Sequence, residues 1–481
     1  MELPAAFSDY TRALLGIGEY NKLADVLEGE QPVSIRLNED KLSDSSFGLF
    51  HAFSEPVPWA STGYYLRNRL TFTFDPLFHA GCYYVQEAAS MFVEQALRQY
   101  VSDSPVVMLD LCAAPGGKST HTRSLLPEGS LLVANEVIRN RSQVLAENLI
   151  KWGHPDVVVT NNDPADFAPL KDFFDVILAD VPCSGEGMFR KDPVAVSEWS
   201  LENVEICWQR QRRIISDIWP CLKPGGILLY STCTYNVKEN EENIRWMRDK
   251  LGAEVLPLET SADWNITGNL LASEEFPVYR FLPHKTKGEG FFLAVVQKKA
   301  GSSISNSAGE CSFFRRKGTK TAGISKESCS SLREWILAPD NYELFPNGSS
   351  VRAFSQCHFP VLSVLQSSLR IVQAGVDVAE LKGRDWMPCH SLAVSRVLRK
   401  DAFVREDIGY EQAVSYLRKE AITLSAAIPR GVVLLTYKNI PLGFVKNIGN
   451  RANNLYPQEW RIRSGYLPEA VLELGTVLWE S

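Results

Sequence analysis

The stretch VVMLDLCAAPGGK at residues 106–118 decides the fold of this chain. An apolar run typical of a buried strand passes into a glycine-rich turn, and a helix is predicted to follow from Ser119. Gly116 and Gly117 allow the backbone to come close to a ligand, and the start of the helix offers free N–H groups. The stretch therefore predicts a ligand-binding loop at the end of a strand.

Similar apolar runs, each bounded by turn residues, recur through the middle of the chain. Six of them predict buried parallel strands, at residues 106–111, 130–136, 156–160, 174–180, 226–231 and 291–297. Helices are expected between them, for example at 140–152 and 203–222, and KPGG at 223–226 is typical of a helix stop and turn. The alternation predicts an α/β fold with a doubly wound, Rossmann-like sheet, whose ligands bind at the carboxyl ends of the strands.

The length of 481 residues indicates more than one domain. Residues 1–105 are expected to form a small α+β module with a helix at 7–27, strands at 63–66 and 70–74, and a helix near 86–100. The α/β domain follows at 106–300. Residues 301–330 are rich in Ser, Gly and Lys and predict a linker, and residues 331–481 predict a small β-rich domain.

Composition and charge narrow the class of protein. The ten cysteines form no paired pattern and no Cys-x-x-Cys motif, which favours free thiols in the cytoplasm over disulfides or a zinc site. No apolar run reaches the length of a membrane-spanning helix, and the N-terminus does not resemble a signal peptide. The net charge of −7 is uneven, because residues 301–481 carry about +5 and residues 1–300 about −12. The C-terminal third is therefore the part better suited to a polyanion.

The glycine-rich loop does not match the common phosphate-binding motifs. A Walker A loop would need glycine five residues before Gly117, where Cys112 stands, and the G-x-G-x-x-G register is also missing. Glu136, at the end of the next strand, suits a ribose diol, and Asp163, after the third strand, can accept from an adenine amino group. The combination predicts an adenosine ligand without phosphates, which indicates S-adenosylmethionine.

Two cysteines directly follow predicted strands, Cys183 in DVPCSG and Cys233 in STCTY. A thiolate can add to an electrophilic ring and divide one difficult step into two, and in cytosine addition at carbon 6 makes carbon 5 nucleophilic enough to take a methyl group. Asp180 can hydrogen-bond the polar edge of such a base. A zinc deaminase is excluded, because Glu186 stands where that motif needs its next cysteine. The residues alone leave open which thiol attacks.

These segments together resemble the RNA 5-methylcytosine methyltransferase family (the NOL/NOP2/Sun group). The resemblance is carried by DLCAAPGGKS at 110–119, DVPCSGEG at 180–187 and STCTY at 231–235, with further matches at 34–38, 223–226, 283–284 and 288–292. GMFRKD at 187–192 and the added C-terminal domain are most similar to the bacterial RsmF type. That type methylates cytosine in the decoding region of 16S ribosomal RNA.

The resemblance assigns roles to residues. It implies that Cys233 is the nucleophile, that Cys183 assists proton removal and product release, and that Asp180 belongs to the catalytic site. It further implies that S-adenosylmethionine is held by Cys112, Ala113, Ala114, Pro115, Gly116, Gly117, Lys118, Glu136, Arg141, Asp163 and Asp180.

The resemblance also sets the expected partner. RNA is expected as substrate, specifically ribosomal RNA and possibly within the small subunit, for a cytoplasmic monomer that does not contact a membrane. Residues 1–105 are expected to be RRM-like and residues 331–481 PUA-like, both binding RNA. Two alternatives stay open: a transfer-RNA cytosine-5 methyltransferase, and a non-catalytic ribosomal-RNA-binding assembly factor. The presence of both thiols, Asp180 and the glycines argues against the second.

Overall fold

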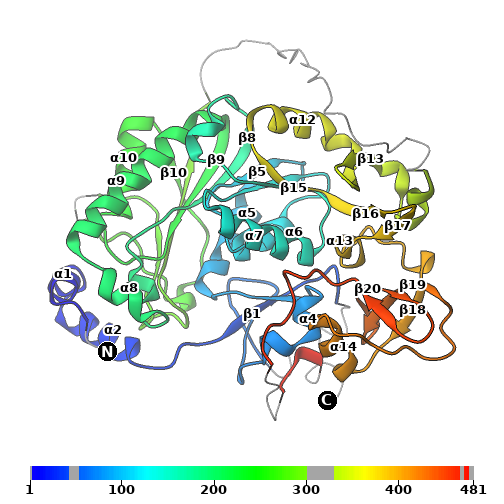
Figure 1. Cartoon of the computed structure of the whole chain (residues 1–481). Helices are drawn as coiled ribbons and strands as arrows, with labels where there is room; N and C mark the ends of the chain where they lie inside the picture. The colour runs from blue at the N-terminus through cyan, green and yellow to red at the C-terminus, as the bar shows by residue number, and fades with distance from the viewer. Residues whose placement is uncertain (1–2, 43–53, 273, 301–329, 466–470, 476–481) are drawn as a thin grey trace.

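The computed structural model describes residues 3–42, 54–272, 274–300, 330–465 and 471–475 (Figure 1). A nine-stranded sheet forms its centre, in the order β10-β12-β9-β8-β5-β6-β7-β15, with β11 paired to β12. Strands β5 to β9 are parallel to their neighbours among themselves, and β10, β11, β12 and β15 add to them in antiparallel fashion. The bounds are Val107–Asp110 (β5), Leu131–Asn135 (β6), Val157–Thr160 (β7), Phe174–Asp180 (β8), Leu222–Thr232 (β9), Glu254–Leu256 (β10), Tyr279–Phe281 (β11), Phe291–Gln297 (β12) and Ile371–Ala374 (β15).

Helices cover both faces of this sheet, as a doubly wound fold requires (Figure 1). Successive residues of a strand point to opposite faces, so Met108 packs in one hydrophobic cluster and Leu109 in the other. The first cluster receives apolar residues of α5 (Val93–Tyr100) and α7 (Arg139–Trp152). The second receives those of α9 (Leu201–Ile218), α10 (Glu241–Leu251) and α12 (Phe359–Ser368).

The order of the strands fixes where a ligand can bind. Strand β5 pairs with β6 on one side and with β8 on the other, so the winding of the chain reverses between them. Loops that leave β5 and β8 in opposite directions open a crevice at such a switch point. The loop from Leu111 to Gly116, which leads into α6 (Gly117–Leu125), lies at this point.

The described part of the N-terminal module contains the helices α1 and α2, the short helix α4 (Pro76–His79) and a four-stranded antiparallel sheet in the order β2-β3-β1-β4. Its elements are α1 (Ala5–Leu15), α2 (Ile17–Leu27), β1 (Ser34–Leu37), β2 (Glu55–Pro56), β3 (Gly63–Tyr65) and β4 (Tyr83–Val85). Residues of β1 and β3 share a hydrophobic cluster with residues of the C-terminal part, for example Ile35 with Val445. The sheet of the N-terminal module and the C-terminal part therefore pack on each other.

The C-terminal part contains two four-stranded sheets, β13-β14-β16-β17 and β18-β19-β20-β21. Between β14 and β16 the chain forms α12 and then β15, which pairs with β7 at the edge of the central sheet. The bounds are Tyr342–Asn347 (β13), Ser350–Ser355 (β14), Val376–Lys382 (β16), Asp385–Pro388 (β17), Val404–Asp407 (β18), Gly431–Tyr437 (β19), Ile440–Asn447 (β20) and Ala452–Asn454 (β21). The linker predicted at residues 301–330 lies outside the described residues except at its last position.

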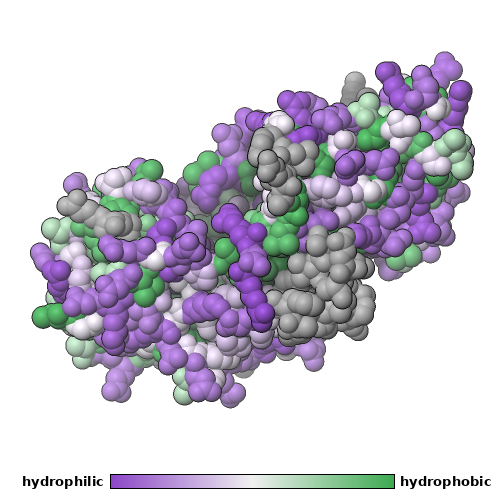
Figure 2. All heavy atoms as spheres, turned by 90° about the horizontal axis from the view of Figure 1, so that it is seen from below, coloured by the Kyte–Doolittle hydropathy of each residue, from purple (hydrophilic) through white to green (hydrophobic). Residues whose placement is uncertain are grey.

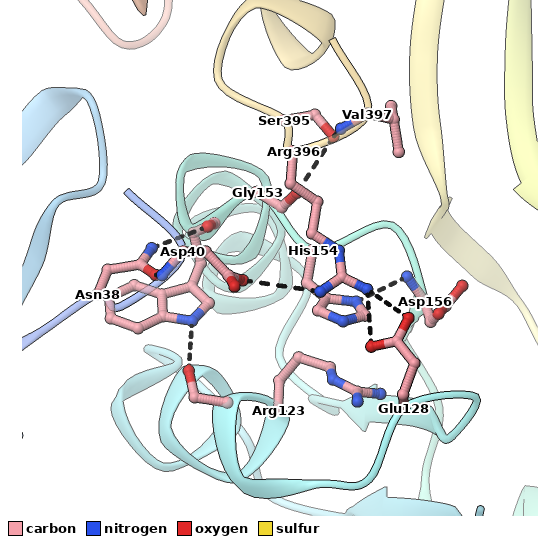
Figure 3. Close-up of polar contacts among 12 residues, drawn as sticks. Asn38, Asp40, Arg123, Glu128, Gly153, His154, Asp156, Ser395, Arg396 and Val397 are labelled. Carbon is pink, nitrogen blue, oxygen red and sulfur yellow. Dashed lines mark hydrogen bonds and ion pairs between the residues drawn. The ribbon is translucent and has the colours of Figure 1, made fainter. Parts of the chain in front are cut away.

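Both flanking modules contact the C-terminal end of α7 (Figure 3). Asn38 Nδ2 of the N-terminal module donates to the carbonyl of Trp152 at 3.0 Å. Ser395 Oγ and the Arg396 amide of the C-terminal part both donate to the carbonyl of Gly153 at 3.1 Å. These donors satisfy carbonyls that a helix end leaves without partners in the helix.

Several sequence predictions are wrong in detail. The helix predicted at 7–27 is interrupted at Gly16, where φ is 83°, and the strand predicted at 70–74 is a 3₁₀ helix, Phe72–Phe74. Residues 223–226 lie inside the long strand β9, so the turn expected there is part of a strand. Residues 291–297 form a strand as predicted, but this strand runs antiparallel to β9. The chain reverses its direction between β11 and β12, which also pair in antiparallel fashion.

The molecular surface is mixed in character. Figure 2 shows a mostly hydrophilic face with apolar residues in small separate groups. Among the described residues, no helix combines the length and the apolar character needed to cross a membrane.

Candidate functional site

A cavity of about 320 Å³ lies at the carboxyl ends of β5, β8 and β9. The predicted ligand loop supplies much of its wall, together with the ends of the strands. These predicted site residues line it: Cys112, Ala113, Ala114, Pro115, Gly117, Lys118, Asp180 and Cys233. Within the described part of the chain, its lining does not include Gly116, Glu136, Arg141, Asp163 or Cys183.

The glycines of the loop serve a close approach of backbone and side chains. Gly116 has a φ of 116°, which side-chain-bearing residues rarely adopt. A Cβ on Gly117 would lie 3.2 Å from the ring of Tyr84, so a larger residue would narrow the cavity. The loop therefore adopts a left-handed conformation at Gly116, and the lack of a side chain at Gly117 keeps the cavity open at the start of α6.

Asp110, the last residue of β5, is fully buried and lines the cavity. Its Oδ2 accepts from the Ser119 hydroxyl at 2.6 Å, while Oδ1 has no hydrogen-bond partner among the residues that the structure describes. Burial raises the pKa of this carboxyl to about 7, the Ser119 bond opposes the rise, and the charge of Asp180 adds to it. A buried acid with a free oxygen favours a ligand that brings a positive charge or a donor.

The acids predicted on the next two strands flank this loop. Glu136 directly follows β6, and its carboxylate lies 3.4 Å from the guanidinium of Arg141. Arg141 in turn donates to the carbonyl of Ala114 at 2.8 Å, which ties the start of α7 to the ligand loop. Asp163 follows β7, accepts from the amide of Ala165 and starts the short helix there.

Asp180 ends β8 with its carboxylate held from two sides. Lys118 Nζ donates to Oδ2 at 2.9 Å, and Ser231 Oγ donates to Oδ1 at 2.7 Å. Burial disfavours the charged form of Lys118, but Asp180 outweighs it, and the pKa of Lys118 lies above its ordinary value. The ion pair places a cation and an anion beside each other on the cavity wall.

The two thiols lie close together in the segments that follow the neighbouring strands β8 and β9. Cys183 Sγ and Cys233 Sγ are 3.2 Å apart, within hydrogen-bonding distance for sulfur, and both residues are partly exposed. The pKa of Cys183 is well above that of an ordinary thiol because of the contact with Cys233 and because of burial. Cys183 is therefore held as a protonated thiol beside a second sulfur that faces the cavity.

Other wall residues were not predicted as site residues, although those at 187–191 and 289–291 lie in segments that carry the family resemblance. The N-terminal module contributes Tyr84, Val85, Gln86, Glu87 and Ser90, and the segments after β8 and before β12 contribute Gly187, Met188, Lys191, Glu289, Gly290 and Phe291. The only signal for the first group is a cluster of polar residues directly after a short strand.

Comparison with known families gives three matches along the chain. The models match "16S rRNA methyltransferase RsmB/F" at residues 101–297, "N-terminal domain of 16S rRNA methyltransferase RsmF" at 3–88, and "Methyltransferase RsmF PUA domain" at 405–462. Ribosomal RNA small subunit methyltransferase F of Cronobacter sakazakii is 30% identical over 97% of both chains. The protein of the same name from an Escherichia coli strain is 31% identical over 90% of this chain and 91% of its own.

Solved structures resemble the central part of the fold. A methyltransferase homologue from Pyrococcus horikoshii is 28% identical and superposes with a TM-score of 0.52, covering 61% of this chain and 94% of its own. NSun6 from the same organism, solved with SFG, has 22% identity and a TM-score of 0.52 over 61% of this chain and 98% of its own, which shows a shared fold. The predicted Rossmann-like methyltransferase domain with an N-terminal module and a C-terminal PUA domain is thus confirmed.

Proposed function

Since the chain belongs to the 16S rRNA methyltransferase F family, we propose that it transfers a methyl group from S-adenosylmethionine to carbon 5 of a cytosine in the decoding region of 16S rRNA. The observation that carries this proposal is the pair of thiols at 3.2 Å, of which Cys233 lines the cavity. The family is S-adenosylmethionine-dependent, and this cofactor supplies an electrophilic methyl group on a positively charged sulfur.

The residues around the cavity fit that cofactor. The unpartnered oxygen of Asp110 can accept from, or balance the charge of, its cationic end. The loop Cys112, Ala113, Ala114, Pro115, Gly116, Gly117 and Lys118 would hold it against the start of α6, with Glu136, Arg141, Asp163 and Asp180 around it. Arg141 acts here by fixing the carbonyl of Ala114.

The chemistry proposed for Cys233 starts with its thiolate. Its sulfur forms a bond to carbon 6 of cytosine, and the electron pair of the carbon 5–carbon 6 double bond moves so that carbon 5 can take the methyl group. Asp180, held by Lys118 and Ser231, hydrogen-bonds the polar edge of the base. Removal of the proton at carbon 5 then restores the double bond and expels the Cys233 thiolate.

Cys183 is proposed to assist this last step. Its raised pKa disfavours it as the attacking thiolate. Its thiol lies 3.2 Å from the Cys233 sulfur, so it can give its proton to that sulfur as the bond to carbon 6 breaks, while its own sulfur takes the proton from carbon 5. The raised pKa of Cys183 and the place of Cys233 on the cavity wall support the assignment of attack to Cys233 and of release to Cys183.

The target base has to be accessible on carbon 5 and carbon 6, so it must be unpaired or leave the stack. We propose RNA contacts by the RRM-like module at residues 1–105 and by the PUA-like domain at 331–481, on either side of the methyltransferase domain at 106–300. We further propose that the protein acts as a monomer in the cytoplasm on ribosomal RNA, possibly in the small subunit.

A trapping experiment tests the roles of the thiols. Cys233→Ala is expected to lower methyl transfer by more than about 1,000-fold, because the nucleophile is lost. Cys183→Ala is expected to accumulate a protein–RNA adduct that survives a denaturing gel. Cys207→Ala, at a buried cysteine of α9, is the matched control and should behave as wild type. Trapping by Cys233→Ala in place of Cys183→Ala would reverse the assignment.

Bisulfite sequencing tests the substrate. Cells without this gene should lose a 5-methylcytosine signal in 16S rRNA and regain it with the wild-type gene. Loss of a transfer-RNA signal would instead support the transfer-RNA alternative, and no loss in either RNA would support a non-catalytic assembly factor.

A further inference from the structure

A buried polar network joins the two loops that carry the thiols. We name the segment 181–187 after β8 the Cys183 loop, and the segment 233–240 after β9 the Cys233 loop. Glu186 of the first loop and Glu239 of the second are 1% and 0% exposed. The side-chain amide of Asn236 lies between them and donates to both carboxylates, at 3.0 Å to Glu186 and 2.8 Å to Glu239.

Each carboxylate belongs to one loop and accepts from the other. Glu186 Oε2 accepts from the backbone amides of Tyr235 at 2.7 Å and Asn236 at 3.0 Å. Glu239 Oε2 accepts from the backbone amide of Ser184, the neighbour of Cys183, at 3.0 Å. The hydrogen bonds of Glu186, Asn236 and Glu239 therefore run in both directions between the two loops, and we call these three residues the clasp. The clasp fixes the backbone near each thiol.

Gln211 of α9 completes the set of donors around Glu239. Its Nε2 donates to Glu239 Oε2 at 2.7 Å and to the carbonyl of Pro182 at 3.0 Å. In all these contacts the carboxylate oxygens accept hydrogen bonds. An amide side chain could accept through its oxygen only, because its nitrogen is a donor. The geometry thus selects glutamate over glutamine at both positions.

Burial of these two carboxylates side by side is unfavourable in free energy, which argues against a purely structural role. Within the described residues, neither Glu186 nor Glu239 forms an ion pair, although burying a charge without a partner is unfavourable. Burial, and then the charge of Glu186, raise the pKa of Glu239 to about 7. The two carboxylates in turn raise the pKa values of groups around them: Glu239 acts on Cys183, Cys207 and Tyr230, and Glu186 acts on Tyr10 and Tyr235.

We propose that Glu239 is a positioning residue for Cys183, and that its clasp with Asn236 and Glu186 sets the spacing of the two thiols. The inference rests on the proposed function, because the clasp acts through Cys183 in the release step that this function includes. Loss of the Glu239 carboxylate frees the amide of Ser184, so Cys183 loses its place beside Cys233. Attack by Cys233 continues, while release of the product slows.

Glu239→Gln is the first test. If the new amide nitrogen takes the place of Oε2, it faces the donors of Ser184 and Gln211. If it takes the place of Oε1, it faces the donor of Asn236. We expect the covalent protein–RNA adduct to accumulate at least about tenfold above wild type on a denaturing gel, as in Cys183→Ala. Glu239→Asp, which keeps the charge but draws it back by one methylene, should accumulate adduct to a smaller extent.

Glu241→Gln provides the control for a merely structural loss. Glu241 is also fully buried and pairs with Arg280 at 2.7 Å, but it does not hold either thiol loop. This variant should lose thermal stability without accumulating adduct. If Glu239→Gln gives no more adduct than Glu241→Gln, while Cys183→Ala does trap RNA, the proposed role of Glu239 is wrong and the proposed function stands.

A second readout needs no RNA. Diamide takes up two hydrogens and joins Cys183 to Cys233 in a disulfide, which intact-mass spectrometry detects as a loss of two mass units. Because the sulfurs lie 3.2 Å apart, wild type should oxidise readily, and Glu239→Gln should do so about tenfold more slowly. Equal rates in the two proteins would overturn the inference even if neither cysteine variant trapped RNA.

Discussion

Gly187 is the position at which a single added carbon should damage catalysis most selectively. Its amide donates to the carbonyl of Cys233 at 2.7 Å, so the two thiol loops touch through backbone atoms. A Cβ at this position would lie 2.5 Å from that carbonyl oxygen and 2.9 Å from the Cα of Gly290. Both neighbours are backbone, so neither can rotate out of the way.

The size of the effect follows from these distances. An ordinary contact begins at 3.4 Å, so the Gly187→Ala substitution has to move the Cys233 backbone by about 0.9 Å. Misplacement of a reacting group by about 1 Å can lower a rate by roughly 100-fold. Overpacking of this kind lowers the free energy of unfolding by about 1–3 kcal/mol. Gly187→Ala should therefore fold, bind S-adenosylmethionine and methylate about 100-fold more slowly.

Single-turnover methylation of small ribosomal subunits, with thermal unfolding measured in parallel, tests this expectation. Gly252→Ala is the matched control, because Gly252 follows α10 with a φ of 68° and an added Cβ would meet nothing within 4 Å. The control should lose about 1 kcal/mol of stability and keep its rate. A Gly187→Ala protein that methylates as fast as Gly252→Ala would refute the argument from backbone contact.

Two further predictions concern the cofactor and the module junction. Burial raises the pKa of Asp110 to about 7, and binding of the cationic cofactor should favour its ionised form. Affinity for S-adenosylmethionine should therefore rise with pH below pH 7 and level off above it, by about tenfold in total between pH 6 and pH 8. Calorimetric titrations from pH 6 to 8 should show this slope in wild type but not in Asp110→Asn; the same slope in both would disprove it. Gly153→Ala should lower the free energy of unfolding by about 2 kcal/mol or more, because Gly153 has a φ of 93° and its Cβ would lie 2.4 Å from the Val394 carbonyl. Thermal unfolding measures this loss, and an unchanged melting temperature would contradict it.

Six strands of the central sheet, β5 to β9 and β12, could be predicted from sequence because each contains a short apolar run between turn residues. The three-residue strands β10 and β11 were not predicted, because they are too short to show a pattern. The direction of the predicted strands could not be predicted, because a strand buried on both faces has the same composition whether it runs parallel or antiparallel, as residues 291–297 illustrate. The strand Ile371–Ala374 was also out of reach. It lies more than 200 residues beyond its partner Val157–Thr160, and no local pattern connects the two.

The site was predictable where a residue lies at or just beyond the end of a strand. Asp180 ends β8, Cys183 comes three residues later and Cys233 directly follows β9, and the carboxyl ends of parallel strands meet at one edge of the sheet. Asp110, which ends β5, was not among the predicted site residues. The clasp behind the thiols was not predictable, because Glu239 lies in a loop without periodicity and its partners come from other segments. Which side chains of a loop turn inward depends on tertiary hydrogen bonds that no spacing rule describes.

The helix α7 is bonded to the ligand loop at its start and to both flanking modules at its end. At its start, Arg141 joins Glu136 to the ligand loop through the carbonyl of Ala114. At its end, Asn38 from one flanking module and Ser395 from the other bind successive carbonyls (Figure 3). A helix is stiff along its axis, so fixing its end also limits where its start can lie. We infer that the flanking modules help to place the ligand loop at residues 111–116 through this helix.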